Sequence, residues 1–139
     1  MKKIKPLFSV LLTLLLTLVF AAAWAEMPEK YNLDNQLEKI PEITNYRFMG
    51  WEAVDDQSFV LQTGPNDYYL VVLNFPSNNL PFSMSIGISS TNSIVRPSFN
   101  SVYFENNGFK ETRFIDKIYK FKDHKQVKDI KVQLTGKKK

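Results

Sequence analysis

Short runs of alternating apolar and polar residues fill residues 45–121, and turn-forming residues separate one run from the next. The first run places Met49 and Trp51 on one side of an extended backbone, and Phe48 and Gly50 on the other. A period of two is typical of β-strands whose two faces meet different surroundings. Closely spaced strands of this kind favour an antiparallel β-fold over a helical or α/β fold.

About six strands are predicted in this region, with turns rich in Asp, Asn, Ser and Gly between them. The pair Asn107 and Gly108 suits a hairpin turn because both residue types tolerate positive φ. Pro76 and Pro81 interrupt the ladder because proline cannot donate a backbone hydrogen bond. The predicted strands cover residues 45–53, 59–63, 68–75, 84–88, 99–105 and 114–121.

The predicted fold class is all-β, a small antiparallel barrel or sandwich, because an open sheet of this size exposes edges that invite aggregation. An immunoglobulin-like sandwich is the alternative, although the chain lacks the cysteine pair of that core. With 139 residues the chain is short of the length at which two cores are expected. Residues 45–121 are therefore expected to form one β domain.

The lead segment before this domain, residues 26–44, is expected to contain a short helix. Asn32 is a suitable N-cap, and Leu33, Leu37 and Ile40 recur at the spacing of one helix face. Such a helix has only about two turns, so its stability would depend on packing against a larger element.

The segment after the β domain, residues 122–139, is a basic tail with two readings. Val127, Ile130 and Leu134 share one face of a helix, whereas Ile130, Val132 and Leu134 alternate as in a strand. We expect a helix.

The first 25 residues have the pattern of a signal peptide. Lys2, Lys3 and Lys5 precede an apolar run over residues 7–23, and Ala23 and Ala25 form an A-x-A cleavage site at its end. Cleavage is expected after Ala25, with export to the periplasm, or beyond the cell as the alternative location. A retained membrane anchor is the competing interpretation, although the apolar run falls short of the roughly 20 residues that span a bilayer.

Charge is distributed unevenly after the leader. Residues 26–109 contain ten acidic and four basic residues, whereas residues 110–139 contain eleven basic and four acidic ones. We expect the basic tail to be solvated and to make at most weak contact with a membrane surface. Nucleic acid is not an expected partner of an exported protein.

The residue types that carry most chemistry are scarce. The chain has no cysteine and a single histidine, His124, which excludes a disulfide scaffold, a thiolate site and a multi-histidine metal site. Asp55 and Asp56 lie in a predicted turn, and no serine has the flanking residues of a nucleophile motif. No catalytic residue, metal site or cofactor is therefore predicted.

One set of residues is a candidate ligand-binding face. Aromatic and basic residues alternate along the predicted strands, and together they could stack on a ligand and pair with its charges. The predicted ligand-binding residues are Tyr69, Tyr103, Tyr119, Lys117 and Lys120.

Several short segments carry a family resemblance: MGWEAVD at residues 49–55, Tyr69 with Leu70, a proline-bearing loop ending at Leu80, and SIG and DKI at residues 85–87 and 116–118. Together they resemble a family of small exported proteobacterial proteins catalogued as a domain of unknown function. The resemblance implies an exported β-rich module and supplies no activity. This chain lacks the cysteines that members typically carry near positions like Ile40, Ser77, Val95 and Arg113.

The sequence thus predicts an exported, non-enzymatic binding or interaction module whose partner is an envelope protein or a glycan. A membrane-anchored structural protein of the envelope is one alternative. A hydrolase with Ser, Asp and His residues brought together from distant positions is the other.

Overall fold

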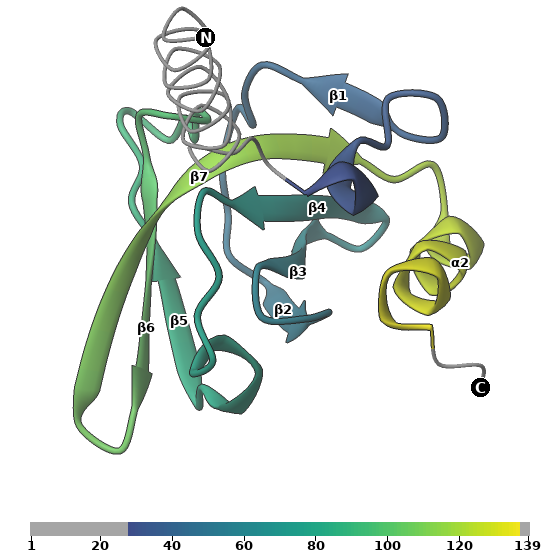
Figure 1. Ribbon diagram of the computed structural model, residues 1–139. Coiled ribbons are helices and arrows are strands. Elements are labelled where there is room, and N and C mark those ends of the chain that lie inside the picture. Colours follow the sequence, from purple (N-terminus) through teal and green to yellow (C-terminus); the bar gives the residue numbers. More distant parts are fainter. Residues whose placement is uncertain (1–27, 137–139) are drawn as a thin grey trace, which may run out of the picture.

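The computed structural model describes residues 28–136, which form a curled half-barrel of seven antiparallel strands with one C-terminal α-helix (Figure 1). The predicted all-β antiparallel fold is confirmed. In chain order the elements are η1 (Glu29–Tyr31), β1 (Glu38–Ile40), β2 (Gly50–Ala53), β3 (Ser58–Gly64), β4 (Asp67–Leu73), η2 (Leu80–Phe82), β5 (Ser85–Ile88), β6 (Ser101–Asn106), β7 (Phe109–Lys120) and α2 (His124–Thr135). No helix within this described part is long and apolar enough to cross a membrane.

The strand β7 connects the two halves of the sheet. The strand order is β2-β3-β4-β7-β6-β5, and β1 also pairs with β7. The N-terminal half of β7 pairs with β6, whereas its C-terminal half pairs with β4 and β1. Between these halves the register shifts: Val72 pairs with Lys117, but Leu73 pairs with Ile115. Such an irregularity bends a strand, and β7 accordingly sweeps across the molecule (Figure 1).

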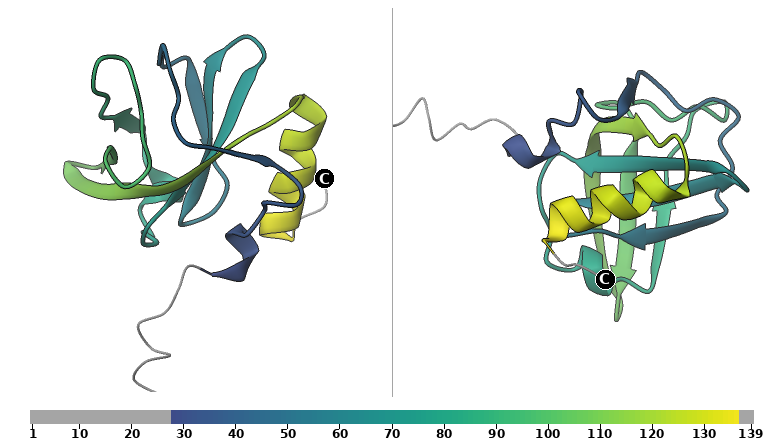
Figure 2. Two further views of the ribbon diagram at one scale, coloured as in Figure 1. Left: turned by 90° about the horizontal axis from the view of Figure 1, so that it is seen from above. Right: turned by 90° about the vertical axis from the view of Figure 1, so that its right-hand side faces the viewer.

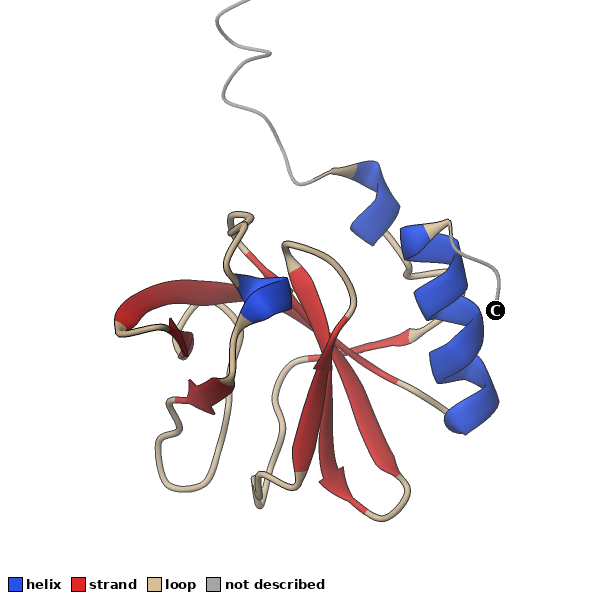
Figure 3. Cartoon of the chain, turned by 90° about the horizontal axis from the view of Figure 1, so that it is seen from below, coloured by secondary structure: helices blue, strands red, loops and turns tan. Residues whose placement is uncertain are grey.

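Two hydrophobic clusters lie on opposite faces of β4. Leu70 and Val72 face α2, where they join a cluster with Val127, Ile130 and Leu134, which project from the helix. Val71 and Leu73 alternate with them and face the inside of the curl, where Phe104 and Ile118 belong to the second cluster. Figure 2 shows α2 lying across the strands, and Figure 3 shows the helix against one side of the sheet.

The hairpin turn and the C-terminal helix agree with the sequence predictions. Asn107 and Gly108 have φ angles of 50° and 87° and connect β6 to β7. The helix α2 begins after Asp123, whose side chain accepts a 2.9 Å hydrogen bond from the amide of Gln126. It ends at Gly136, which has a φ of 67°. The tail is therefore helical over most of its length.

The N-terminal region differs from the prediction. The short helix lies earlier, at η1, and residues 33–37 form a single turn in which the amide of Leu37 bonds to the carbonyl of Leu33 at 2.8 Å. The helix does not continue because residues 38–40 pair with β7 as β1. The predicted strand over residues 45–53 begins only at Gly50, because the pairing with β3 covers only residues 50–53. Asn45, at the predicted start, has a positive φ of 51°. The predicted leader, with Ala23 and Ala25, lies outside the described residues.

Candidate functional site

An open hollow lies at the fork where the chain leaves β4 and separates from β7. The amide of Asn74 donates a 2.9 Å hydrogen bond to the carbonyl of Phe114, and beyond Phe75 the chain turns away at a proline. The hollow has a volume of about 330 Å3 and is lined by Asn74, Phe75, Thr112, Arg113 and Phe114. This volume is at the lower end of the range of small-ligand sites, roughly 300–1,000 Å3.

An ion pair with a fixed geometry borders the hollow. Nη2 of Arg113 lies 3.2 Å from Oε2 of Glu111, two residues away on the same side of β7. The hydroxyl of Ser77 donates a 2.5 Å hydrogen bond to Oε2 of Glu111, and the side-chain Nδ2 of Asn79 donates to Oε1. These hydrogen bonds, with the charge of Arg113, hold the pKa of Glu111 below its ordinary value. The pair therefore stays ionised and adds no net charge to the site.

Two polar atoms of the lining residues have no hydrogen-bond partner among the described residues. They are Oδ1 of Asn74 and Nε of Arg113, and both are buried. Leaving a buried donor or acceptor unpaired costs about 1–3 kcal/mol, and most native structures avoid it. The terminal torsion of an asparagine side chain is soft, so the Asn74 amide can turn toward an incoming group. The lining thus holds one acceptor and one donor that no group in the described part of the chain satisfies.

Two phenylalanine residues line the same hollow. Phe75 is 65% exposed and Phe114 is 52% exposed, although both are large apolar residues. Exposed aromatic rings beside a few fixed polar groups are the composition typical of recognition sites. The arrangement can bind a group that both donates and accepts hydrogen bonds, next to an apolar surface.

The structure does not gather the five predicted ligand-binding residues on one surface. Tyr69 and Lys120 are direct neighbours across β4 and β7. Lys117 lies nearby on β7, with its amine 4.0 Å from Asp116. Tyr103 lies on β6, in the other half of the sheet, where its ring covers Gly87 of β5.

Tyr119 is fully buried and connects the N-terminal segment to the sheet. Its hydroxyl accepts a 3.1 Å hydrogen bond from the amide of Leu33 and lies 3.0 Å from the carbonyl of Tyr31 and 2.9 Å from Oδ1 of Asp34. Burial, reinforced by the carboxylate of Asp34, raises the pKa of Tyr119 to about 12. This residue contributes to the stability of the fold.

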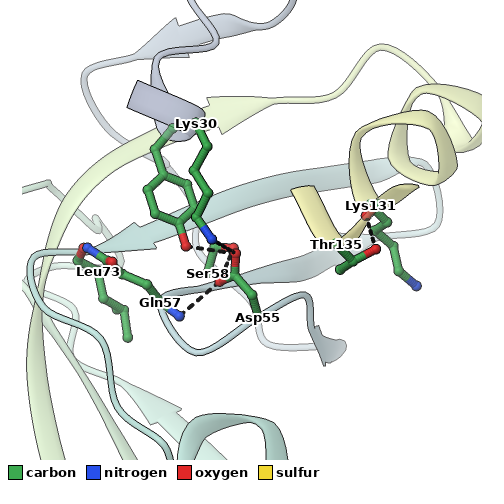
Figure 4. A network of polar contacts seen from close by, with 8 residues as sticks. Lys30, Asp55, Gln57, Ser58, Leu73, Lys131 and Thr135 are labelled. Atoms are coloured by element: carbon green, nitrogen blue, oxygen red, sulfur yellow. Dashed lines mark hydrogen bonds and ion pairs between the residues drawn. The ribbon is translucent and has the colours of Figure 1, made fainter. Parts of the chain in front are cut away.

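Asp55, one of the two carboxylates in the β2–β3 turn, lies in a hydrogen-bond network that supports the fold (Figure 4). It accepts hydrogen bonds from the hydroxyls of Tyr31 at 2.7 Å and Ser58 at 2.8 Å, and from the amine of Lys30 at 3.1 Å. Burial raises the pKa of Asp55, but these bonds and one from the amide of Gln57 outweigh it, so the pKa lies below its ordinary value. The network holds η1 against the turn.

Metal-ligating side chains do not cluster in the described part of the chain. Within residues 28–136, no three His, Asp or Glu side chains gather closely enough to hold a metal ion. The ring of His124 contacts Tyr68 edge to face, with 5.5 Å between the ring centroids.

A model of one protein family matches residues 5–138 of this chain. The chain belongs to that family, described as Family of unknown function (DUF6491). No curated protein and no solved structure matches it. The resemblance inferred from the short sequence segments, to a family of unknown function, is thereby confirmed.

The residues of the hollow were missed by the sequence analysis. Asn74 and Arg113 are far apart in the sequence, and neither belongs to a motif. One signal was available: Glu111 and Arg113 alternate in phase with the buried Ile115, which predicts two charged residues on the core side of a strand. Charged groups on that side need partners or a function.

Proposed function

We propose that this member of the family is an exported, non-enzymatic module that binds a partner in the envelope through the hollow at the β4–β7 fork. The leader pattern of residues 1–25, with its expected cleavage site, supports export to the periplasm. The observation that carries the binding role is the unpaired Oδ1 of Asn74 and Nε of Arg113, in residues that line the same hollow as the exposed Phe75 and Phe114.

Binding fits these groups better than catalysis. The carboxylate beside the hollow, Glu111, is held in its ionised form by an arginine and two hydrogen-bond donors, which makes it a weak proton acceptor. The nearest hydroxyl in that network, on Ser77, already donates to Glu111, and no histidine orients it as a nucleophile. A hollow of this kind can hold a partner without changing it.

Crosslinking in intact cells that export the protein, followed by purification, tests the proposal. We expect Asn74→Ala and Phe75→Ala to lose most of the crosslinked partner that the wild-type protein retains. Phe82→Ala is the matched control, because Phe82 is 73% exposed and lies in η2, outside the residues that line the hollow. Equal recovery with all three variants would contradict the proposal.

A second contact, with a membrane surface, is supported by the charge of α2 and its flanks. Lys122, Lys125 and Lys128 are exposed, whereas Lys131 forms an ion pair with Glu52. Each basic residue near an anionic surface contributes about 1 kcal/mol. Sedimentation with anionic vesicles is expected to retain the wild-type protein weakly, and to lose it when the three exposed lysines are replaced by glutamine. Retention that is insensitive to these replacements or to salt would argue against the contact.

A further inference from the structure

One edge of β7 is open beside the hollow. On one side, β6 pairs with β7 from Phe109 to Phe114. On the other side, β4 pairs with β7 only from Ile115 onward, and the bond from Asn74 to Phe114 is the last contact of that ladder. Residues 109–113 of β7 therefore have a strand partner on one side only.

The backbone groups on this open edge follow from strand alternation. The carbonyl of Phe114 points toward Asn74, away from β6. Successive residues of a strand direct their hydrogen-bonding groups to alternate sides, so those of Thr112 and Lys110 point the same way as those of Phe114. The carbonyl of Thr112 accepts a 3.1 Å hydrogen bond from Nη1 of Arg113. The register leaves the amide of Thr112 and both backbone groups of Lys110 without a partner among the described residues.

We propose, on the basis of the binding function above, that this edge binds an extended peptide segment of a partner protein, which adds to the sheet as a strand in line with β4. Donors and acceptors that recur at every second residue are matched by the backbone of another strand, and strand addition is a recurring mode of peptide recognition. The side chains of Lys110 and Thr112 are exposed, so a segment can approach.

The hollow lies where this added strand would end against Asn74. A side chain of the segment that enters the hollow meets Phe75 and Phe114. Once the Asn74 amide turns toward it, an amide or hydroxyl on that side chain pairs with Oδ1 of Asn74. The backbone edge supplies affinity, and the hollow supplies selectivity for one side chain.

The same edge of a second copy is a poor partner for this edge. An antiparallel pairing of two copies centred on Lys110 places two lysines opposite each other, and one centred on Glu111 places two glutamates opposite each other. Like charges in these positions are destabilising. A pairing centred on Thr112 needs space opposite Phe114, which Asn74 already occupies. Self-pairing of this edge is thus disfavoured, and we assign the edge to a segment of a different polypeptide, with an acidic or neutral residue opposite Lys110.

A displayed library of random linear peptides, selected on the purified exported protein, tests this inference. Thr112→Pro removes the free edge amide, and proline is tolerated at an edge whose N–H is not part of the ladder. Thr112→Val is the matched control, since it changes the same side chain but keeps the amide. We expect Thr112→Pro to weaken the selected peptides about tenfold, the effect of losing one hydrogen bond, and Thr112→Val to change their affinity little.

Amide hydrogen exchange gives a second readout that does not depend on the variants. In the free protein the amides of Lys110 and Thr112 are expected to exchange quickly, and a bound peptide is expected to slow both. Equal binding to Thr112→Pro and Thr112→Val, unprotected edge amides, or no selected peptide would overturn strand addition.

The failure of this inference is distinguishable from failure of the binding role. If Asn74→Ala releases the crosslinked partner and Thr112→Pro does not, or if neutral oligosaccharides bind and peptides do not, the hollow binds its partner without an added strand. If Asn74→Ala and Phe75→Ala both retain the partner, the proposed function itself fails.

Discussion

The hydroxyl of Ser77 donates a 2.5 Å hydrogen bond to Oε2 of Glu111, thirty-four residues later in the chain. This bond, with the one from Asn79, ties the connection between β4 and β5 to the side of β7 that faces Phe104. The loop thereby closes one end of the inner hydrophobic cluster, to which the buried Leu80 belongs.

Glu111→Gln is expected to lower the free energy of unfolding by about 1–2 kcal/mol, because hydrogen bonds to a charged group are stronger than those to a neutral one. Urea denaturation measures the change. Glu105→Gln is the control, since Glu105 is exposed on the opposite face of β6–β7 and its side chain forms no hydrogen bond or ion pair with the described residues. Equal effects of the two substitutions would show that the hydrogen bonds from the β4–β5 connection to Glu111 contribute nothing.

The carboxylate of Asp55 makes the stability of the fold depend on pH. Its pKa in the folded state lies below the ordinary value of 3.8, so the unfolded chain binds more protons between these two pKa values. The stabilisation is complete above pH 3.8 and is lost as the pH falls through the folded pKa. Denaturation curves recorded over this acidic range should show a steeper loss for the wild-type protein than for Asp55→Asn. Asp56→Asn, which changes the neighbouring carboxylate, should keep the wild-type slope.

Tyr119→Phe removes one hydroxyl and leaves the amide of Leu33 without its partner. Because this position is buried, we expect a loss of about 1–3 kcal/mol in the free energy of unfolding. Thermal and chemical denaturation provide the measurement. Tyr103→Phe is the matched control, because the side chain of Tyr103 is half exposed and its hydroxyl forms no recorded hydrogen bond within residues 28–136. If Tyr119→Phe left the free energy of unfolding unchanged, water would be replacing the missing hydroxyl.

Gly87 and Tyr103 form a cross-strand pair in which the ring lies over the glycine backbone. A β-carbon at position 87 would lie 2.1 Å from Cε2 of Tyr103, so Gly87→Ala must displace the ring. We expect a cost of about 1 kcal/mol. In the Tyr103→Ala background the same substitution should cost nothing, and a double-mutant cycle measures the difference. Additive effects would show that the ring moves away freely.

Local patterns predicted most of the strands because alternation and turn chemistry are short-range properties. The residue types of Asn107 and Gly108 were sufficient to predict the β6–β7 turn. The spacing of Val127, Ile130 and Leu134 predicted the buried face of α2. The spacing of Leu33 and Leu37 was misread, because one turn followed by a strand can bury the same two residues. The competing strand exists only because β7 supplies its partner.

The candidate site could not be predicted in the same way. Its hollow exists because Asn74 reaches Phe114 and the chain then departs, and no short segment records that geometry. The predicted aromatic face failed to assemble for a related reason. Tyr119 and Tyr103 occupy similar positions in alternating patterns, but one lies beneath η1 and the other lies on the second half of the sheet.

Asp116 is the additional residue at the register shift in β7, since Lys117 and Ile115 pair with consecutive residues of β4. Removing it would leave Ile115 and Ile118 on the side they occupy now, because the residues around it would simply alternate. The bend would disappear, however, and β5 and β6 would swing off the surface they cover. The concave shape of this protein therefore depends on the number of residues in β7 at the register shift. Homologues with one residue fewer at this point should have a flatter sheet.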